Sequence, residues 1–139
     1  KERFALNMIS VKDGTFYACD GHRMHCLKVE HFTDNYQDGL YNLYKTKEGF
    51  MLEKDGIGKT YPDVEKVIPK VFFEWGEIVL SKDNDRNAAM LLKALPPDTG
   101  IMLKYLEDAG CGICHFKDKN NPILIDGGKR KSVIMPFEI

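Results

Sequence analysis

Cysteine and histidine side chains form the most metal-like cluster in this sequence. Cys111, Cys114 and His115 fall close together, and thiolate and imidazole groups are the usual ligands of structural zinc. Further possible ligands are the cysteines and histidines of an earlier segment: Cys19, His22, His25 and Cys26. If residues 111–116 form a strand, however, Cys111 and Cys114 point to opposite faces and cannot share a metal ion. The sequence therefore predicts no metal site and no cofactor, and four reduced thiols that are buried by default.

Asp20 and His22 have the residue types of an acid–base pair. They flank Gly21 in a tight turn, and neither a Gly-x-Ser-x-Gly nucleophile motif nor a phosphate-binding glycine loop accompanies them. Solvated or core positions are the simpler interpretation of the other histidines. These residues predict a binding protein and not an enzyme.

Tight turns separate the strand-like segments that would position these side chains. Asp-Gly pairs recur at 13–14, 20–21, 38–39 and 55–56, and Asp-Gly suits hairpin turns because glycine adopts positive φ at low cost. The runs between them predict a three-strand meander over 4–11, 15–19 and 24–29, and a hairpin over 40–45 and 50–53. Later strands are predicted over 72–80, 101–106, 111–116, 122–125 and 133–137.

One helix is predicted between a cap at Asp83 or Asn84 and the proline pair at 96–97. Its apolar face is expected to hold the residues at helical spacing: Ala88, Leu91, Leu92 and Leu95. Segment 61–69 is expected to be extended, because prolines near both ends disfavour a helix. The chain is thus predicted to be one α+β domain over residues 1–139, with antiparallel sheet and one or two packed helices. If the domain consists of two βαβββ halves, we expect its first strand and helix to be missing from this chain.

The overall composition limits the partners. The net charge is −1, from 20 basic and 21 acidic residues, which argues against a generally basic nucleic-acid coat. No apolar run approaches the length of a membrane span, and the first residues lack a signal-peptide stretch. A cytoplasmic protein without a membrane partner is expected.

Four segments resemble the β sliding clamp of bacterial DNA polymerase III. Residues 3–7 and 18–24 are similar to that family's aromatic-Leu-Asn strand and Ala-Thr-Asp-Gly-His-Arg-Leu segment. Residues 61–69 resemble the family's Phe-Pro-Asp-Tyr connector ending in Leu-Pro, and residues 132–137 its C-terminal Val-Val-Met-Pro-Met. The segments occur in family order, and the resemblance implies a DNA-clamp-like fold.

The sequence also departs from that family. The likeness is poor across residues 30–59, Cys19 stands in place of the usual threonine, and Glu138 stands where a basic residue is common. Family clamps are three-domain chains that form a two-subunit ring, whereas this chain has the length of one domain. A homo-oligomeric ring is therefore an open expectation.

The resemblance implies a hydrophobic pocket for short linear peptides of DNA polymerases, the clamp loader and repair proteins, typically a Gln followed by spaced Leu and Phe. Carried over residue by residue, the pocket uses three segments: Leu6, Cys19, Gly21, His22, Arg23 and Met24; then Pro62, Lys66 and Val67; then Val133, Ile134, Met135, Pro136 and Phe137. The residue types suit this role, since methionine adapts to several partners and glycine permits close backbone approach. Arg23 and Lys66 are expected to bind a peptide's polar or acidic end.

The resemblance further implies weak contact with the backbone of duplex DNA. The basic and aromatic residues placed for it are Arg3, Phe4, Lys82, Arg86 and Lys93. Asp83 and Asp85 dilute the local charge, so binding would be salt-sensitive, and an ordinary solvated helix face is the alternative.

Three functions follow from these observations. The first is a sliding-clamp-like accessory factor of DNA replication. The second is a monomeric interaction module, of phage or mobile-element type, that competes for clamp partners. The third, ranked last, is a zinc enzyme or a zinc-stabilised domain. The oligomeric state separates the first two, and metal analysis tests the third.

Overall fold

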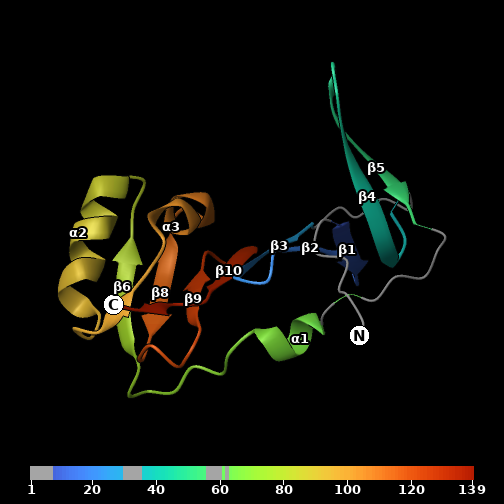
Figure 1. Ribbon diagram of the computed structural model, residues 1–139. Coiled ribbons are helices and arrows are strands. Elements are labelled where there is room, and N and C mark those ends of the chain that lie inside the picture. The colour runs from blue at the N-terminus through green and yellow to red at the C-terminus, as the bar shows by residue number, and fades with distance from the viewer. Residues whose placement is uncertain (1–7, 30–35, 56–60, 62) are drawn as a thin grey trace.

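A computed structural model describes residues 8–29, 36–55, 61 and 63–139. Most strands join one nine-stranded antiparallel sheet in the order β5-β4-β1-β2-β3-β10-β9-β8-β6. The predicted α+β class with antiparallel meanders is confirmed (Figure 1). Among these described residues, no helix is long and apolar enough to cross a membrane.

The N-terminal meander consists of β1 (Met8–Lys12), β2 (Thr15–Cys19) and β3 (Arg23–Lys28). These strands match the predicted meander, although residues 4–7 of its first strand lie outside the described residues. Asp13 and Gly14 both have positive φ, 50° and 77°, which gives the turn the twist that a two-residue hairpin needs. The predicted hairpin follows as β4 (Gly39–Thr46) and β5 (Gly49–Lys54). Strand β4 pairs with β1, so the hairpin extends the sheet at one edge.

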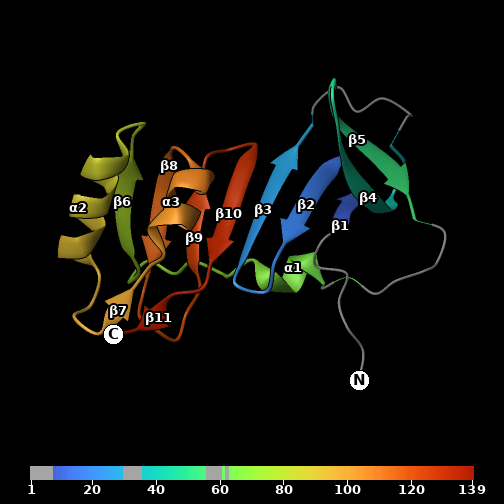
Figure 2. The same ribbon diagram turned by 45° about the horizontal axis from the view of Figure 1, so that its top comes forward.

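The C-terminal half contains two helices that pack on the sheet. Its elements are β6 (Gly76–Leu80), α2 (Asn84–Ala94), β7 (Thr99–Gly100), α3 (Leu103–Ala109), β8 (Gly112–Phe116), β9 (Ile123–Asp126), β10 (Arg130–Ile134) and β11 (Phe137–Glu138). Strands β3 and β10 pair with Met24 opposite Val133, which joins the two halves into one sheet. Helices α2 and α3 lie in front of the C-terminal half of the sheet (Figure 2).

The two sheet faces carry separate apolar clusters. The larger one lies beneath α2 and α3 and includes Leu91, Leu106, Ile125 and Ile134. The smaller one lies on the other face beneath the short helix α1 (Val64–Val67), where Val64 packs with Met24, Leu124 and Val133. Alternation along β10 therefore sends consecutive side chains into different clusters.

The connector over residues 61–69 was expected to be extended throughout, but its central residues are helical. Residues 64–67 form one helical turn, which begins after Asp63, whose carboxylate accepts a hydrogen bond from the Glu65 N–H at 3.3 Å. Pro69 restricts only its immediate neighbourhood, so a single turn fits before it. Aspartate is a favoured helix-capping residue, so Asp63 is the local sequence signal that predicts this helical turn.

Three predicted strands differ from the structure. The strand predicted over 133–137 begins earlier, as β10 (Arg130–Ile134), and stops before Pro136, which has no N–H to donate, while Phe137 and Glu138 form the separate strand β11. Residues 72–75 form a turn closed by a hydrogen bond from the Trp75 N–H to the Phe72 carbonyl, and strand β6 begins only at Gly76. Residues 103–109 form helix α3 instead of a strand over 101–106. An ion pair between Lys104 and Asp108 at 3.0 Å supports one exposed side of α3, and Gly110 ends the helix with a φ of 77°.

Helix α2 is confirmed with Asp83 as its cap, and Leu91 and Leu95 of its predicted apolar face pack in the main core, but Leu92 does not belong to that face. Leu92 is 83% exposed, whereas Asn87 is buried beside Leu91. The Asn87 side chain accepts a hydrogen bond from the Ser81 N–H and donates one to the Ser81 carbonyl, at 2.9 and 2.8 Å. Both Ser81 backbone groups thereby gain partners, which explains why a polar residue occupies this buried position.

Candidate functional site

A groove of about 400 Å³ opens on the sheet face that carries α1. Paired residues of β3 and β10, Met24 and Val133, form its floor and are both buried. Lys66 and Val67 of α1 contribute one side, and Met135, which is 43% exposed, contributes another. The groove thus combines a firm apolar floor with an apolar residue at its margin.

The turn between β2 and β3 shapes one end of this groove. The Asp20 carboxylate accepts hydrogen bonds from the N–H groups of His22 and Arg23 at 3.0 and 3.1 Å. Burial alone would raise the pKa of Asp20, but these hydrogen bonds and the Arg23 guanidinium outweigh burial and lower it. The Met135 N–H donates to the His22 carbonyl at 2.9 Å, which ties the tail to this turn.

The guanidinium of Arg23 is bound within the protein. Its Nε donates to Asp20 at 3.1 Å and its Nη1 to Asp108 of α3. The guanidinium carbon also lies 4.3 Å from the centre of the Tyr105 ring. Arg23 therefore fastens β3 to α3, and its expected role in binding a peptide's acidic end is not supported by this geometry. Lys66, whose side chain is almost fully exposed, is the remaining cation at the groove.

The structure gathers most of the pocket residues expected from sequence around one groove. Those that line it are Cys19, Gly21, His22, Arg23, Met24, Lys66, Val67, Val133 and Met135. Pro122, directly before β9, also lines it and was not expected; no sequence motif links it to the other segments. Leu6 and Pro62 lie outside the described residues.

Three expected tail residues do not line the groove. Ile134 has no solvent exposure and packs in the cluster beneath α2 and α3, because it points to the opposite face from Val133. Pro136 follows Met135, and Phe137 belongs to β11, where it pairs with Gly100 near the end of α2. Glu138 pairs with Lys119, at 2.6 Å, so the last residues form a separate anchored unit.

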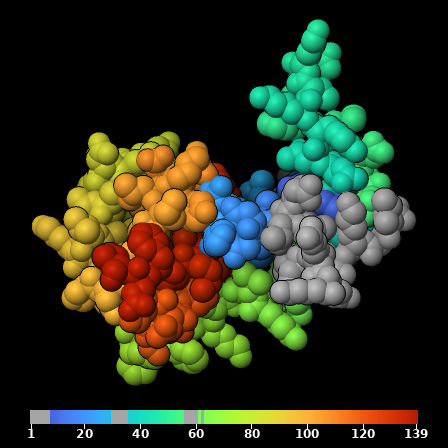
Figure 3. Space-filling view, viewed as in Figure 1, coloured from blue at the N-terminus to red at the C-terminus, as the bar shows by residue number. Residues whose placement is uncertain are grey.

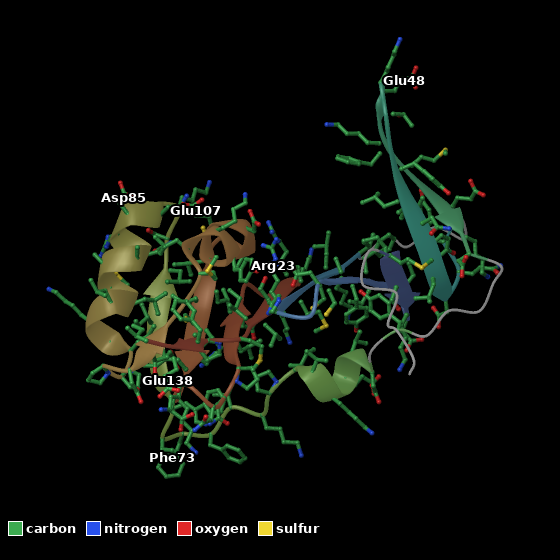
Figure 4. All side chains as sticks on the ribbon, in the orientation of Figure 1. Arg23, Glu48, Phe73, Asp85, Glu107 and Glu138 are labelled. Atoms are coloured by element: carbon green, nitrogen blue, oxygen red, sulfur yellow. The ribbon has the colours of Figure 1, made fainter. Side chains whose placement is uncertain are left out.

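The residues expected to contact DNA lie apart from the groove. Lys82, Arg86 and Lys93 are exposed on or beside α2. Acidic side chains are interspersed on this side, with Asp85 near the start of α2 and Glu107 on α3 (Figure 4). Arg3 and Phe4 fall outside the described residues. The helix side therefore has mixed charge.

The expected separation of Cys111 and Cys114 is confirmed. The expectation that all four thiols are buried is wrong for Cys111, which is exposed directly before β8, and Cys19 is only half-buried. Cys114 is fully buried, and burial raises the pKa of its thiol to about 12. A thiol that resists deprotonation is a poor zinc ligand. Within the described part of the chain, no three cysteine, histidine or carboxylate side chains are grouped to hold a metal ion.

Several solved structures share this architecture. The β subunit of DNA polymerase III from Thermotoga maritima superposes with a TM-score of 0.61 at 15% identity, covering 96% of this chain and 58% of that chain. This is the fold of the bacterial sliding clamp. The Helicobacter pylori β clamp bound to a DNA ligase peptide gives 0.60 at 13% identity, covering 96% and 57%. The Pseudomonas aeruginosa β subunit gives 0.59 at 17% identity, covering 100% and 60%.

The similarity to clamps is visible in the fold and not in overall sequence. No protein-family model and no curated protein matches the sequence. The chain spans less than two thirds of the length of each of these clamps.

Proposed function

We propose that this protein is a sliding-clamp-like accessory factor of DNA replication that binds short linear peptides in the groove between α1, β3 and β10. The observation that carries the proposal is the convergence of three distant segments on one apolar groove. The clamp fold supports it, since one clamp of this fold was solved with a DNA ligase peptide bound.

The groove has the properties that recognition of an extended peptide requires. Its floor, Met24 and Val133, is apolar and fixed by pairing of β3 with β10. Methionine at the floor and at the margin allows different apolar anchors to be accommodated. Lys66 can bind an acidic residue of the peptide, because its side chain is largely exposed beside the groove and its ammonium group lies as far as 4.0 Å from its ion-pair partner Asp63.

The partners that we propose are peptides of the polymerase, clamp-loader and repair-protein kind. The probe is a fluorescent peptide with Gln followed by spaced Leu and Phe, titrated with the protein and followed by anisotropy. We expect micromolar affinity, about −8 kcal/mol, as is usual for small interfaces with one or two buried anchors. A scrambled peptide of the same composition is the control. Equal affinity for both peptides, or no binding of either, would contradict the proposal.

The role that we propose is non-catalytic, with weak contact to the DNA backbone as a secondary property. A monomeric module that competes for clamp partners is the second candidate. The mixed charge around α2 and α3 favours it, because a surface without net positive charge attracts DNA poorly. Ring formation stays a prediction, and the mass in solution at several concentrations tests it.

A further inference from the structure

The residues that follow β10, 135–139, form what we call the tail, and its first residue belongs to the groove. Met135 stands at the groove margin and is partly exposed, so packing alone holds its side chain weakly. A hydrogen bond from its N–H to the His22 carbonyl ties it to the body of the molecule. Pro136 comes next and has no N–H to donate. The position of Met135 therefore depends on how the rest of the tail is held.

Backbone pairing holds the far end of the tail. Strand β11 pairs with β7, with Phe137 opposite Gly100. The Ile139 N–H donates to the Asp98 carbonyl at 3.0 Å, which continues this pairing beyond β11. The tail lies at the surface, where its red atoms adjoin orange atoms of the C-terminal half (Figure 3). A pair of such short strands is weak alone, so side chains must support it.

Lys119, in the loop between β8 and β9, provides part of that support. Its ammonium group lies 2.6 Å from the Glu138 carboxylate and 3.1 Å from the Asp98 carboxylate, so one cation joins the tail to the residue before β7. The hydrogen bond to Glu138 and then that to Asp98 raise the pKa of Lys119, and Lys119 in turn lowers the pKa of Asp98. Lys119 and Asp98 therefore stay charged throughout the neutral range.

The loop that carries Lys119 is fixed by its own hydrogen bonds. The Asp118 carboxylate accepts one from the Asn120 N–H at 2.9 Å and one from the Asn121 side chain at 2.7 Å. Neither bond uses the Lys119 side chain, so the loop is a firm support against which the tail is held. The loop leads directly to Pro122, which lines the groove.

Close packing of Phe137 on Gly100 supplies the rest of the support. A Cβ atom added at Gly100 would lie 2.5 Å from the Phe137 ring, a distance that real contacts do not reach, so the ring rests directly on the glycine backbone. We call this packing, together with the ion pairs of Lys119 with Asp98 and Glu138, the latch.

We propose that the latch positions Met135 for peptide binding, and that Lys119 is a positioning residue of the groove. The Lys119 ammonium group binds Asp98 and Glu138, so it acts on the groove through the tail. This inference rests on the peptide-binding function proposed above. With the latch closed, Met135 is held at the groove margin before a peptide arrives, so binding does not have to order it. With the latch broken, that ordering costs affinity.

Amide hydrogen exchange tests the latch without any peptide. In Lys119→Ala, exchange should quicken by about threefold at Ile139 and also at Met135, because two exposed ion pairs are lost and each contributes modestly. Lys117→Ala is the matched control, since Lys117 is exposed in the same loop outside the latch and carries the same charge. Lys119→Arg keeps the cation and should restore slow exchange. Unchanged exchange at Met135 in folded Lys119→Ala protein overturns the proposal.

Peptide titration shows whether the latch acts through Met135. The probe is the fluorescent peptide with Gln followed by spaced Leu and Phe, and Lys119→Ala should bind it about threefold more weakly than wild type or Lys117→Ala does. Gly100→Ala displaces the Phe137 ring without a change in charge and should weaken binding in the same way. In a Met135→Ala background, Lys119→Ala should cause no further loss, because the side chain that the latch positions is gone. Circular dichroism confirms that each variant is folded.

The outcomes separate this proposal from that of peptide binding. If the wild type does not distinguish the peptide from its scrambled control, both proposals fail. If the wild type binds the peptide but Lys119→Ala binds it as tightly, only the latch proposal fails. The latch proposal alone also fails if the losses from Lys119→Ala and Met135→Ala add in full, since the two side chains would then act independently.

Discussion

Val133 and Ile134 are neighbours in β10, yet their side chains lie on opposite faces of the sheet. Val133 forms the floor of the proposed peptide groove opposite Met24, and Ile134 is enclosed beneath α2 and α3. One strand therefore supplies both the proposed binding surface and the main core. Substitutions one residue apart should consequently have different effects.

Ile134→Ala should destabilise the protein by about 2–5 kcal/mol, because it leaves a cavity in a fully enclosed site. Urea unfolding followed by circular dichroism measures this loss. Ile139→Ala is the matched control: Ile139 is largely exposed, so a change within about 0.5 kcal/mol is expected. Peptide affinity of the folded Ile134→Ala protein should be unchanged, and a selective loss of affinity would place Ile134 in the groove after all.

The ion pairs of Asp108 should make stability depend on acid pH. Hydrogen bonds from Arg23 and then Lys104 lower the pKa of Asp108, so the folded state binds its proton less tightly than the unfolded chain. Their contribution is complete above the unfolded pKa, about 3.9, and is lost as pH falls through the lower folded pKa. Asp108→Asn should therefore be less stable than wild type at neutral pH, with the difference disappearing toward acid.

A series of urea unfolding experiments from neutral to acid pH tests this dependence. Glu48→Gln is the control, because Glu48 lies exposed at the turn of the β4–β5 hairpin, far from Arg23 and Glu107 (Figure 4). A difference between Asp108→Asn and wild type that stays constant with pH would show that the carboxylate's charge is not what stabilises the contact between β3 and α3.

How much of this molecule is predictable from sequence depends on whether the signal is local. The β1–β2 hairpin of the meander is predictable because Asp13 and Gly14 adopt the positive φ angles that a two-residue turn requires. Helix α3 was missed because Ile101 and Leu103 resemble a strand locally, while the helix is stabilised by packing of Leu106 and Ala109 on distant strands.

The groove shows the same limit at the level of single residues. Resemblance to clamps brought three distant segments together correctly, because each carries a recognisable motif. The resemblance could not predict that Val133 faces the groove while Ile134 faces the core, since a motif gives residue types and not the sheet face on which each side chain lies.

Binding to linear duplex DNA should be weak, independent of sequence and lost as salt rises. Arg86→Glu with Lys93→Glu should weaken it further and reduce the salt slope by about two, because two phosphate contacts would be lost. The protein should remain folded, since both side chains are exposed on α2. Lys70→Glu with Lys117→Glu gives the same change in net charge at exposed positions elsewhere and is the control. Equal losses in the two double variants would mean that net charge, and not the α2 surface, governs DNA binding.

Met135→Asp should strongly weaken peptide binding without unfolding the protein. Met135 is partly exposed at the margin of the groove, so its side chain can be replaced at small cost to the fold. Its backbone N–H still donates to the His22 carbonyl, which keeps the tail in place. A carboxylate at this position would have to lose water when an apolar anchor enters beside Val133, and affinity should fall by about tenfold or more.

Met102→Asp is the matched control for this prediction. Met102 is 48% exposed, close to the 43% of Met135, but it lies directly before α3 on the other side of the sheet. Aspartate is a favoured residue at that helix-capping position, so the control variant should be at least as stable as wild type. Anisotropy titrations on both variants, with circular dichroism to confirm folding, show whether affinity falls because a negative charge is added anywhere or because it is added at the groove. If folded Met135→Asp protein binds the peptide as tightly as Met102→Asp protein does, the tail does not line the binding site, and the peptide must reach Met24 and Val133 from the α1 side alone.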